Sequence, residues 1–265
     1  MSLFILKAII SFIVGFVWIT GSSMFAEKLG PKIGGVIAGL PATMVVALLF
    51  IGLTQGGLVA SLSTTAIPLT LSVNAVFVVL FILLSKRFSV LLSLLTSLIF
   101  WFFATFLIAL QTYSNFSVFI LLGSGIIFLC YYILEKKMCI HVVEGKKLVF
   151  NTSQIIFRGM LGGVAVFFSV VMSKISGPTM AGIFATFPAL TVAMIVIIYR
   201  TQPVTFLHSL LKNFIISGTL NVILFVISAR YLIIYFGLSL GIFFSLCISI
   251  VFAFVLYFVI NKKLS

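Results

Sequence analysis

The sequence predicts an all-α polytopic membrane protein, in which about nine transmembrane helices form two inverted four-helix repeats joined by a linker helix. Composition, apolar runs and an internal duplication each predict part of this fold class. The chain has 265 residues, of which 63% are hydrophobic and 7% are charged. Soluble proteins carry about 25% charged residues, so most of this chain can be buried only against lipid.

Nine apolar runs are long enough to cross a bilayer, for which a helix needs about 20 predominantly apolar residues. The runs cover residues 3–25, 33–53, 58–84, 88–110, 117–134, 155–173, 179–199, 204–228 and 233–260. A long polar stretch follows the fifth run. The predicted organisation is therefore a first four-helix repeat (1–112), a linker helix with a basic cytoplasmic loop (113–154) and a second, inverted four-helix repeat (155–265).

The basic residues predict the orientation. Nine spans place thirteen of the sixteen Lys and Arg residues on one side of the membrane, and only Lys7, Lys174 and Arg230 on the other. Because short basic loops stay in the cytoplasm, we expect a multi-pass protein of the cell (inner) membrane with its N-terminus outside and its C-terminus in the cytoplasm. The charges do not gather in one patch, so we expect the lipid bilayer and a small-molecule solute as partners, and no nucleic acid. The sequence carries no signal of oligomeric state.

An internal duplication predicts the two repeats. The segment 30–42 aligns with 177–189 at an offset of 147 residues, and the same offset pairs Asn74 with Asn221 without a gap. One unpaired span separates the two copies, so the second copy enters the membrane from the opposite side. Inverted repeats of this kind are found in many secondary transporters.

Each copy has a proline near the middle of a predicted span, Pro41 in the second run and Pro188 in the seventh. A proline inside a helix has no amide hydrogen and displaces the carbonyl four residues earlier, here the carbonyls of Ile37 and Phe184. We interpret the two prolines as gating kinks beside a solute path; the alternative is that proline and small residues are only a packing device. The small residues assigned to the kinks are Gly35, Ala38, Gly182 and Ala185.

A Gly-Pro pair starts each of these two helices. The pairs are Gly30 with Pro31 and Gly177 with Pro178, and proline is favoured in the first turn of a helix. Each helix start directs amide donors and a positive dipole end toward one membrane interface, where an anion can be received.

Polar side chains on the third and eighth runs are the candidate solute ligands. Asn74 follows Thr70 by four residues and Asn221 follows Ser217 by four, so each pair shares one helical face. These pairs either line a cavity near the prolines or only join neighbouring helices by hydrogen bonds. With the threonines just after the prolines, the substrate-binding candidates are Asn74, Asn221, Thr70, Ser217, Thr43 and Thr191.

The start of the eighth run predicts an interfacial segment. Thr205, His208 and Lys212 recur at helical spacing after Pro203, and long cationic side chains extend toward the membrane surface. We therefore expect His208 and Lys212 at the cytoplasmic interface.

In plan, the chain resembles the drug/metabolite transporter superfamily and the two-domain fluoride exporters, which join antiparallel four-span halves by one helix. The resemblance implies a fused 4+1+4 arrangement. The intramembrane glutamate of small multidrug transporters is missing, and Ser63-Thr64-Thr65 does not reproduce the fluoride-channel signature, so neither chemistry is carried over. The run Ala-Gly-Leu-Pro-Ala at 38–42 also resembles a segment of GlpM-like inner-membrane proteins.

These observations favour a transporter or facilitator of a small neutral or anionic solute, working by alternating access at a midplane site between the repeats. The alternative is a non-transporting membrane component that handles lipid or assembles a partner complex through its basic linker. An enzyme is not expected, because no set of nucleophile and base is recognisable. No catalytic residue, metal site or cofactor is expected either; the chain has no Asp, only three Glu, and three scattered cysteines.

Overall fold

The computed structural model describes residues 2–28, 39–111, 115–140 and 151–264, and every regular element in these ranges is helical. In chain order the elements are α1 (Ser2–Lys28), α3 (Ala42–Gln55), α4 (Gly57–Ser63), α5 (Ile67–Ser85), α6 (Val90–Ala109), α7 (Phe116–Tyr132), the π-helix η1 (Ile133–Lys137), α8 (Thr152–Ile175), α9 (Gly177–Ala185), α10 (Ala189–Tyr199), α11 (Val204–Phe236) and α12 (Leu238–Leu264).

Within the described ranges, eight helical segments are long and apolar enough to cross a membrane. They are α1, α4–α5, α6, α7–η1, α8, α9–α10, α11 and α12. Helix α3, in the predicted span 33–53, is shorter because it begins only after Pro41. The prediction of an all-α polytopic membrane protein is thus confirmed.

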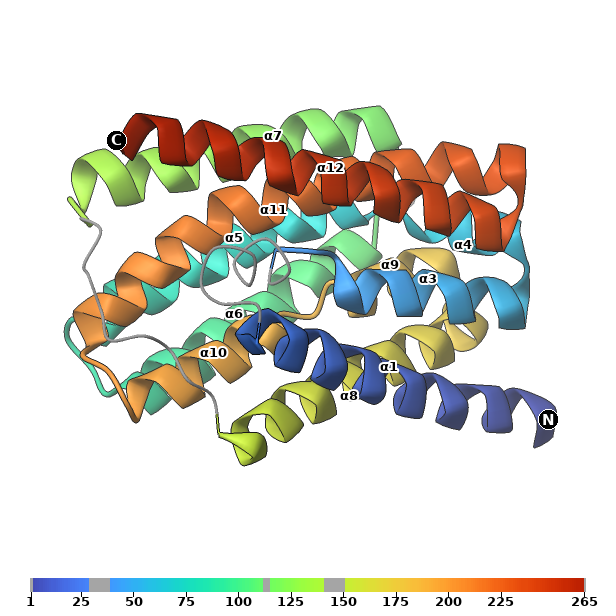
Figure 1. Cartoon of the computed structure of the whole chain (residues 1–265), viewed down its shortest axis with the longest axis horizontal. Coiled ribbons are helices and arrows are strands. Elements are labelled where there is room, and N and C mark those ends of the chain that lie inside the picture. The colour runs from blue at the N-terminus through green and yellow to red at the C-terminus, as the bar shows by residue number, and fades with distance from the viewer. Residues whose placement is uncertain (1, 29–38, 112–114, 141–150, 265) are drawn as a thin grey trace.

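The two halves run in opposite directions (Figure 1). Helices α1 and α8 cross the bundle in opposite senses, as do α5 and α11. Helices α3 and α10 both begin near the middle of the bundle and run toward opposite ends. Helix α1 begins at one end of the bundle and α12 finishes at the other, as an odd number of crossings requires.

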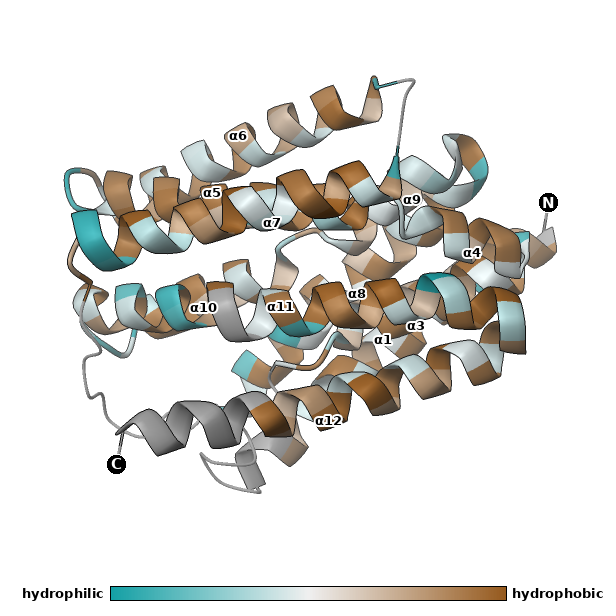
Figure 2. Cartoon of the chain, turned by 90° about the horizontal axis from the view of Figure 1, so that it is seen from above, coloured by the Kyte–Doolittle hydropathy of each residue, from teal (hydrophilic) through white to brown (hydrophobic). Residues whose placement is uncertain are grey.

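Apolar side chains cover the outside of the bundle. Helices α1, α6, α7 and α12 expose large apolar residues, among them Val17, Phe103, Leu121 and Val251. Figure 2 shows the hydrophobic character of α7 and of the coloured part of α12. The more buried α5, α9, α10 and α11 form the interior, so these helices are the ones that can enclose a site.

Glycines on α8 let α1 pack against it closely. A Cβ atom added at Gly159 would lie 2.1 Å from the Thr20 hydroxyl oxygen, and one added at Gly163 would lie 2.9 Å from the Phe12 carbonyl oxygen. Small residues at helix contacts are a common device in membranes, where van der Waals packing replaces the hydrophobic effect.

One predicted boundary is wrong, and one predicted span has an internal turn. The bounds of the third span agree with the prediction, but a turn at 64–66 divides it into α4 and α5. The eighth span does not end at residue 228; α11 continues to Phe236, and the chain turns at Gly237, whose φ of 79° favours glycine. Ser63, Thr64 and Thr65 mark the first turn in the sequence and Gly237 marks the second, but neither signal gave the length of the helix beside it.

We expect Gly123→Ala to destabilise the fold. A Cβ atom at Gly123 would lie 2.4 Å from the backbone carbonyl oxygen of Pro68, and such overpacking costs about 1–3 kcal/mol. The matched control is Gly125→Ala on the same helix, where nothing lies within 4 Å. Thermal unfolding of the purified variants in detergent should show a lower Tm for Gly123→Ala alone. Equal Tm values would contradict the close contact between α5 and α7.

Candidate functional site

Two prolines interrupt helices near the centre of the bundle. Helix α9 ends at Ala185 and α10 begins at Ala189, with Pro188 as its N-cap residue. Pro41 is the N-cap residue of α3 in the same way. Before Pro188 the structure has a full break rather than the predicted kink, and a new helix starts after each of the two prolines.

At the second break, which lies between α9 and α10, the hydrogen bonds differ from those predicted for a proline kink. The Phe184 carbonyl is not released, because it accepts a bond from the Phe187 amide at 3.1 Å. The Thr186 amide donates to the carbonyls of Gly182 and Ile183, at 3.2 and 3.1 Å, and the Phe187 carbonyl accepts from Ala189 at 2.7 Å. A tight turn therefore satisfies most of the end of α9. Ile37, its expected counterpart, lies outside the described residues.

At each break, a backbone carbonyl accepts a hydrogen bond from an asparagine of the opposite half. Asn74 of α5 donates from Nδ2 to the Thr186 carbonyl at 2.9 Å, and Asn221 of α11 donates from Nδ2 to the Gly39 carbonyl at 2.9 Å. Thr186 and Gly39 are themselves 147 residues apart, two residues before their prolines. The duplication thus produces a reciprocal pair of hydrogen bonds between the halves.

The fourth helix of each half holds its asparagine in place. Trp101 of α6 donates from Nε1 to Asn74 Oδ1, and Ser249 of α12 donates its hydroxyl to Asn221 Oδ1 at 3.0 Å. Trp101 is fully buried, and its ring meets that of Phe187 edge to face at 5.3 Å. Both asparagine oxygens are therefore occupied and both amides are aimed at the breaks.

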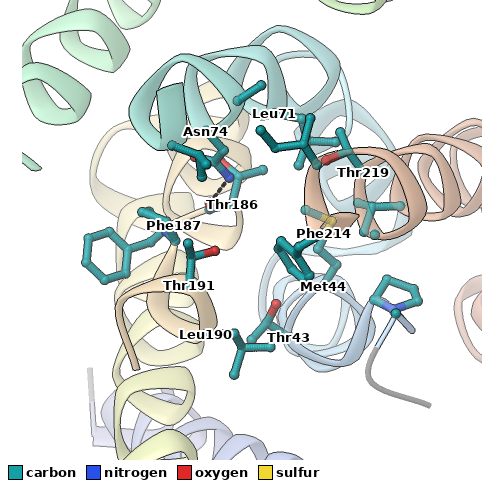
Figure 3. A pocket seen from close by; sticks show the side chains of 18 of the residues that line it. Thr43, Met44, Leu71, Asn74, Thr186, Phe187, Leu190, Thr191, Phe214 and Thr219 are labelled. Carbon is teal, nitrogen blue, oxygen red and sulfur yellow. Dashed lines mark hydrogen bonds between the residues drawn. The ribbon is translucent and has the colours of Figure 1, made fainter. Parts of the chain in front are cut away.

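A pocket of about 90 Å³ lies between the two breaks. Its walls come from the residues before and after Pro41 and Pro188 and from one face each of α5 and α11. The polar lining consists mainly of threonines, and in Figure 3 the hydroxyls of Thr43, Thr191 and Thr219 are turned toward the space. None of the described lining residues carries an ionisable side chain.

The first turns of α3 and α10 also lie at the wall of the pocket. Amides in the first turn of a helix have no partner within the helix. Among the described hydrogen bonds, none is donated by the amides of Thr43 and Met44 or by those of Leu190 and Thr191. These four residues line the pocket, so hydrogen-bond donors from both halves surround it.

One protein-family model matches both halves of the chain. A family model described as "Protein of unknown function (DUF3147)" matches residues 8–114 and again residues 155–262. The chain belongs to the DUF3147 family. Two matches to one model indicate that the halves of this DUF3147 protein are copies of one unit, as the internal alignment predicts. No curated protein and no solved structure matches the chain.

The structure brings some of the predicted residues to the pocket and not others. Thr43, Asn74, Ala185, Pro188 and Thr191 line it, as does Pro41. Asn221 is 1% exposed and holds Gly39 rather than lining the pocket. The Thr70 hydroxyl bonds the Ala66 carbonyl of its own helix at 2.5 Å, and Thr70 is not a lining residue.

The remaining predicted positions are packing positions or lie outside the description. Gly182 packs against α4, where an added Cβ atom would lie 2.1 Å from the Ser63 carbonyl oxygen. Gly177 and Pro178 form the first turn of α9, with Gly177 at a φ of 83°. The Ser217 side chain is outside the described part of the chain, as are Gly30, Pro31, Gly35 and Ala38.

Sequence reasoning missed four contributors, Thr186, Thr219, Trp101 and Ser249. Thr219 lies two residues before Asn221. It could have been found from its position inside an apolar span, where a polar side chain is costly and often functional. Ser249 carries the same signal, and Trp101 carries none; the partner of each depends on how the fourth helix of its half packs. In the described residues, no three His, Cys, Asp or Glu side chains gather as a metal site would require.

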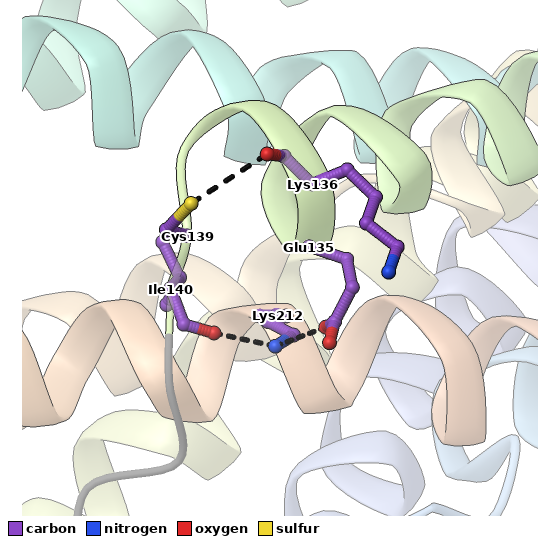
Figure 4. A network of polar contacts seen from close by, with 5 residues as sticks. All are labelled: Glu135, Lys136, Cys139, Ile140 and Lys212. Atoms are coloured by element: carbon purple, nitrogen blue, oxygen red, sulfur yellow. Dashed lines mark hydrogen bonds and ion pairs between the residues drawn. The ribbon is translucent and has the colours of Figure 1, made fainter.

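The side chains of His208 and Lys212 do not extend toward the membrane surface as expected. Lys212 is 6% exposed on a continuous α11, where it pairs with Glu135 and donates to the Ile140 carbonyl (Figure 4). His208 is also 6% exposed and its Nε2 lies 2.8 Å from the Ser85 hydroxyl. The polar face of this segment is directed into the protein because η1 and α5 cover it.

We expect Asn74→Leu to destabilise the protein by about 1–3 kcal/mol, because it leaves the Thr186 carbonyl and the Trp101 Nε1 without partners. Thr70→Val on the same helix is the matched control. It removes only a local bond, and the Ala66 carbonyl keeps the Thr70 amide as a donor. Thermal unfolding measures both. A loss in Thr70→Val as large as that in Asn74→Leu would contradict the assigned role of the asparagine.

Proposed function

We propose that this protein is a membrane transporter or facilitator of a small neutral or anionic solute, which reaches a pocket at the middle of the membrane from the two sides in turn. The observation that carries the proposal is the pocket itself, which lies between two broken helices of inverted halves. Broken helices at the interface of inverted repeats form the solute sites of many secondary transporters.

The composition of the walls supports this function. Helices α3 and α5 of the first half and α10 and α11 of the second half enclose the pocket. A small rotation of one half against the other would therefore open the pocket on one side and close it on the other. The threonine hydroxyls and the open amides offer hydrogen bonds to a solute, while the absence of carboxylates among the described lining residues disfavours a cationic one.

Accessibility of introduced cysteines tests the proposal. In a chain with Cys130, Cys139 and Cys247 replaced by alanine, we expect Thr191→Cys to react with a charged methanethiosulfonate reagent. The reaction should occur in right-side-out and in inside-out vesicles. The control is Thr105→Cys on α6, whose side chain is 3% exposed and outside the pocket. It should not react.

Labelling of Thr191→Cys from one side only would contradict alternating access. Labelling from neither side would contradict a hydrated pocket and favour a non-transporting membrane component.

The charge distribution supports an orientation with the N-terminus outside and the C-terminus in the cytoplasm. The turns that join α5 to α6 and α10 to α11 carry Lys86, Arg87 and Arg200, and both lie at the end of the bundle opposite to the start of α1 (Figure 1). Basic loops of this length are retained on the cytoplasmic side.

We expect a reporter fused to Ser265 to be active in the cytoplasm, and a tag placed before Ser2 to be accessible from outside intact cells. Tags at both termini on the same face would contradict the odd number of crossings and the inversion that follows from it.

A further inference from the structure

We propose that the pocket binds a small anion with a single charge, held by the first-turn amides of α3 and α10 and by the hydroxyls of Thr191 and Thr219. This inference names the solute class and rests on the proposed function for its role as cargo. It is based on the backbone hydrogen bonds at the two breaks, where the carbonyl groups and the amide groups differ.

Each helix break produces carbonyl groups, which attract cations, and amide groups, which attract anions. The carbonyl side of the second break is largely neutralised. The Phe184 and Phe187 carbonyls accept from backbone amides, and the Thr186 carbonyl accepts from Asn74. At the first break, the Gly39 carbonyl accepts from Asn221. Asparagines from the opposite halves thus remove the attraction that the breaks would offer to a cation.

The amide side of both breaks is left open. Helix α3 has 14 residues and α10 has 11, and neither start has a side-chain cap. The two helices run apart from the middle of the bundle, so their positive ends meet there (Figure 1). The described hydrogen bonds include none from the amides of Thr43, Met44, Leu190 and Thr191. The pocket therefore has open amide donors at its wall from both halves, although its side chains are neutral.

Two nearly buried hydroxyls point independently to a ligand. Thr191 is 6% exposed and Thr219 is 8% exposed, and both line the pocket. No described hydrogen bond involves either hydroxyl, and Figure 3 shows both turned into the space. By contrast, Thr70 and Thr105 bond a carbonyl of their own helix. The hydroxyls of Thr191 and Thr219 are open to the pocket, so a bound acceptor would give each of them a partner.

The size and the remaining walls set the charge and the bulk of the anion. A pocket of about 90 Å³ admits a group of a few non-hydrogen atoms, since one water needs about 10–15 Å³ on this measure. The described lining offers no Lys or Arg to balance a second charge, and apolar side chains such as Leu71 and Phe214 form part of the wall. A weakly hydrated anion with one charge fits, whether it is inorganic or a short carboxylate.

Ligand-dependent thermal unfolding tests the inference without relying on transport. The full chain in detergent is titrated with chloride, nitrate, formate or acetate, each replacing gluconate at constant ionic strength. We expect at least one of these anions to raise Tm to a plateau, as a ligand that binds only the folded protein does. Comparison of chloride and nitrate with formate and acetate shows whether the pocket prefers an inorganic anion or a carboxylate.

The variants locate the binding. Thr191→Val and Thr219→Val should each weaken the Kd from this titration by about tenfold, the usual effect of losing one hydrogen bond to a charged group. Thr191→Ser, which keeps the hydroxyl, should restore it. The control Thr105→Val removes a buried hydroxyl outside the pocket and should leave Kd unchanged.

Failure has distinct signatures. The inference is overturned if no anion raises Tm above gluconate, if both valine variants keep the wild-type Kd, or if neutral urea or glycerol stabilises the protein as well as the anions do. Flux in proteoliposomes separates the two proposals. Flux of a neutral solute without anion stabilisation would leave the transporter standing and overturn the anion. Anion stabilisation that depends on Thr191, without flux of any solute, would support the anion site and contradict the transporter.

Discussion

The hydrogen bonds that Asn74 and Asn221 make across the two halves are the interactions on which the centre of this molecule depends. Inside a bilayer an interrupted helix has unpaired backbone groups that lipid cannot satisfy. The asparagines supply the missing donors at Thr186 and Gly39. Because each asparagine comes from the opposite half, the bonds that satisfy the backbone at the breaks also join the two halves.

The linker helix contributes to this arrangement from the outside. Helix α7 packs closely on the start of α5 through Gly123. Near the beginning of α7, the Phe116 ring lies 4.4 Å below the guanidinium of Arg230, which also donates to the hydroxyls of Thr64 and Thr65. At its other end, Glu135 of η1 pairs with Lys212. Helix α7 with η1 therefore contacts the second half at both of its ends and the first half between them.

Much of the architecture could be predicted from the sequence because it follows from composition and spacing. The duplication predicted two copies, and Pro41 and Pro188 marked the positions of the breaks. The form of the breaks could not be predicted, because the choice between a kink and a tight turn depends on which donors are near. At Thr186 the donor comes from Asn74, 112 residues earlier in the chain.

The pocket itself could be predicted only in part. Thr43 and Thr191 were expected there because they follow the prolines, yet they are not counterparts in the duplication: Thr43 aligns with Leu190, and Thr191 aligns with Met44. Thr70 was expected on the same face as Asn74 but bonds within its own helix. Helical spacing identifies a shared face, and it does not say whether a hydroxyl turns outward or back to its own backbone.

The reciprocal asparagines also bear on why two similar units remain in a single polypeptide. Each unit lacks the donor that completes its own interrupted span and carries the one that its counterpart needs. Two separate products would have to be made in equal amounts and inserted with opposite orientations before either could be finished. Covalent fusion through a connector with an odd number of spans removes both requirements. It also allows the two copies to differ: the donor to Asn74 is Trp101, and the donor to Asn221 is Ser249.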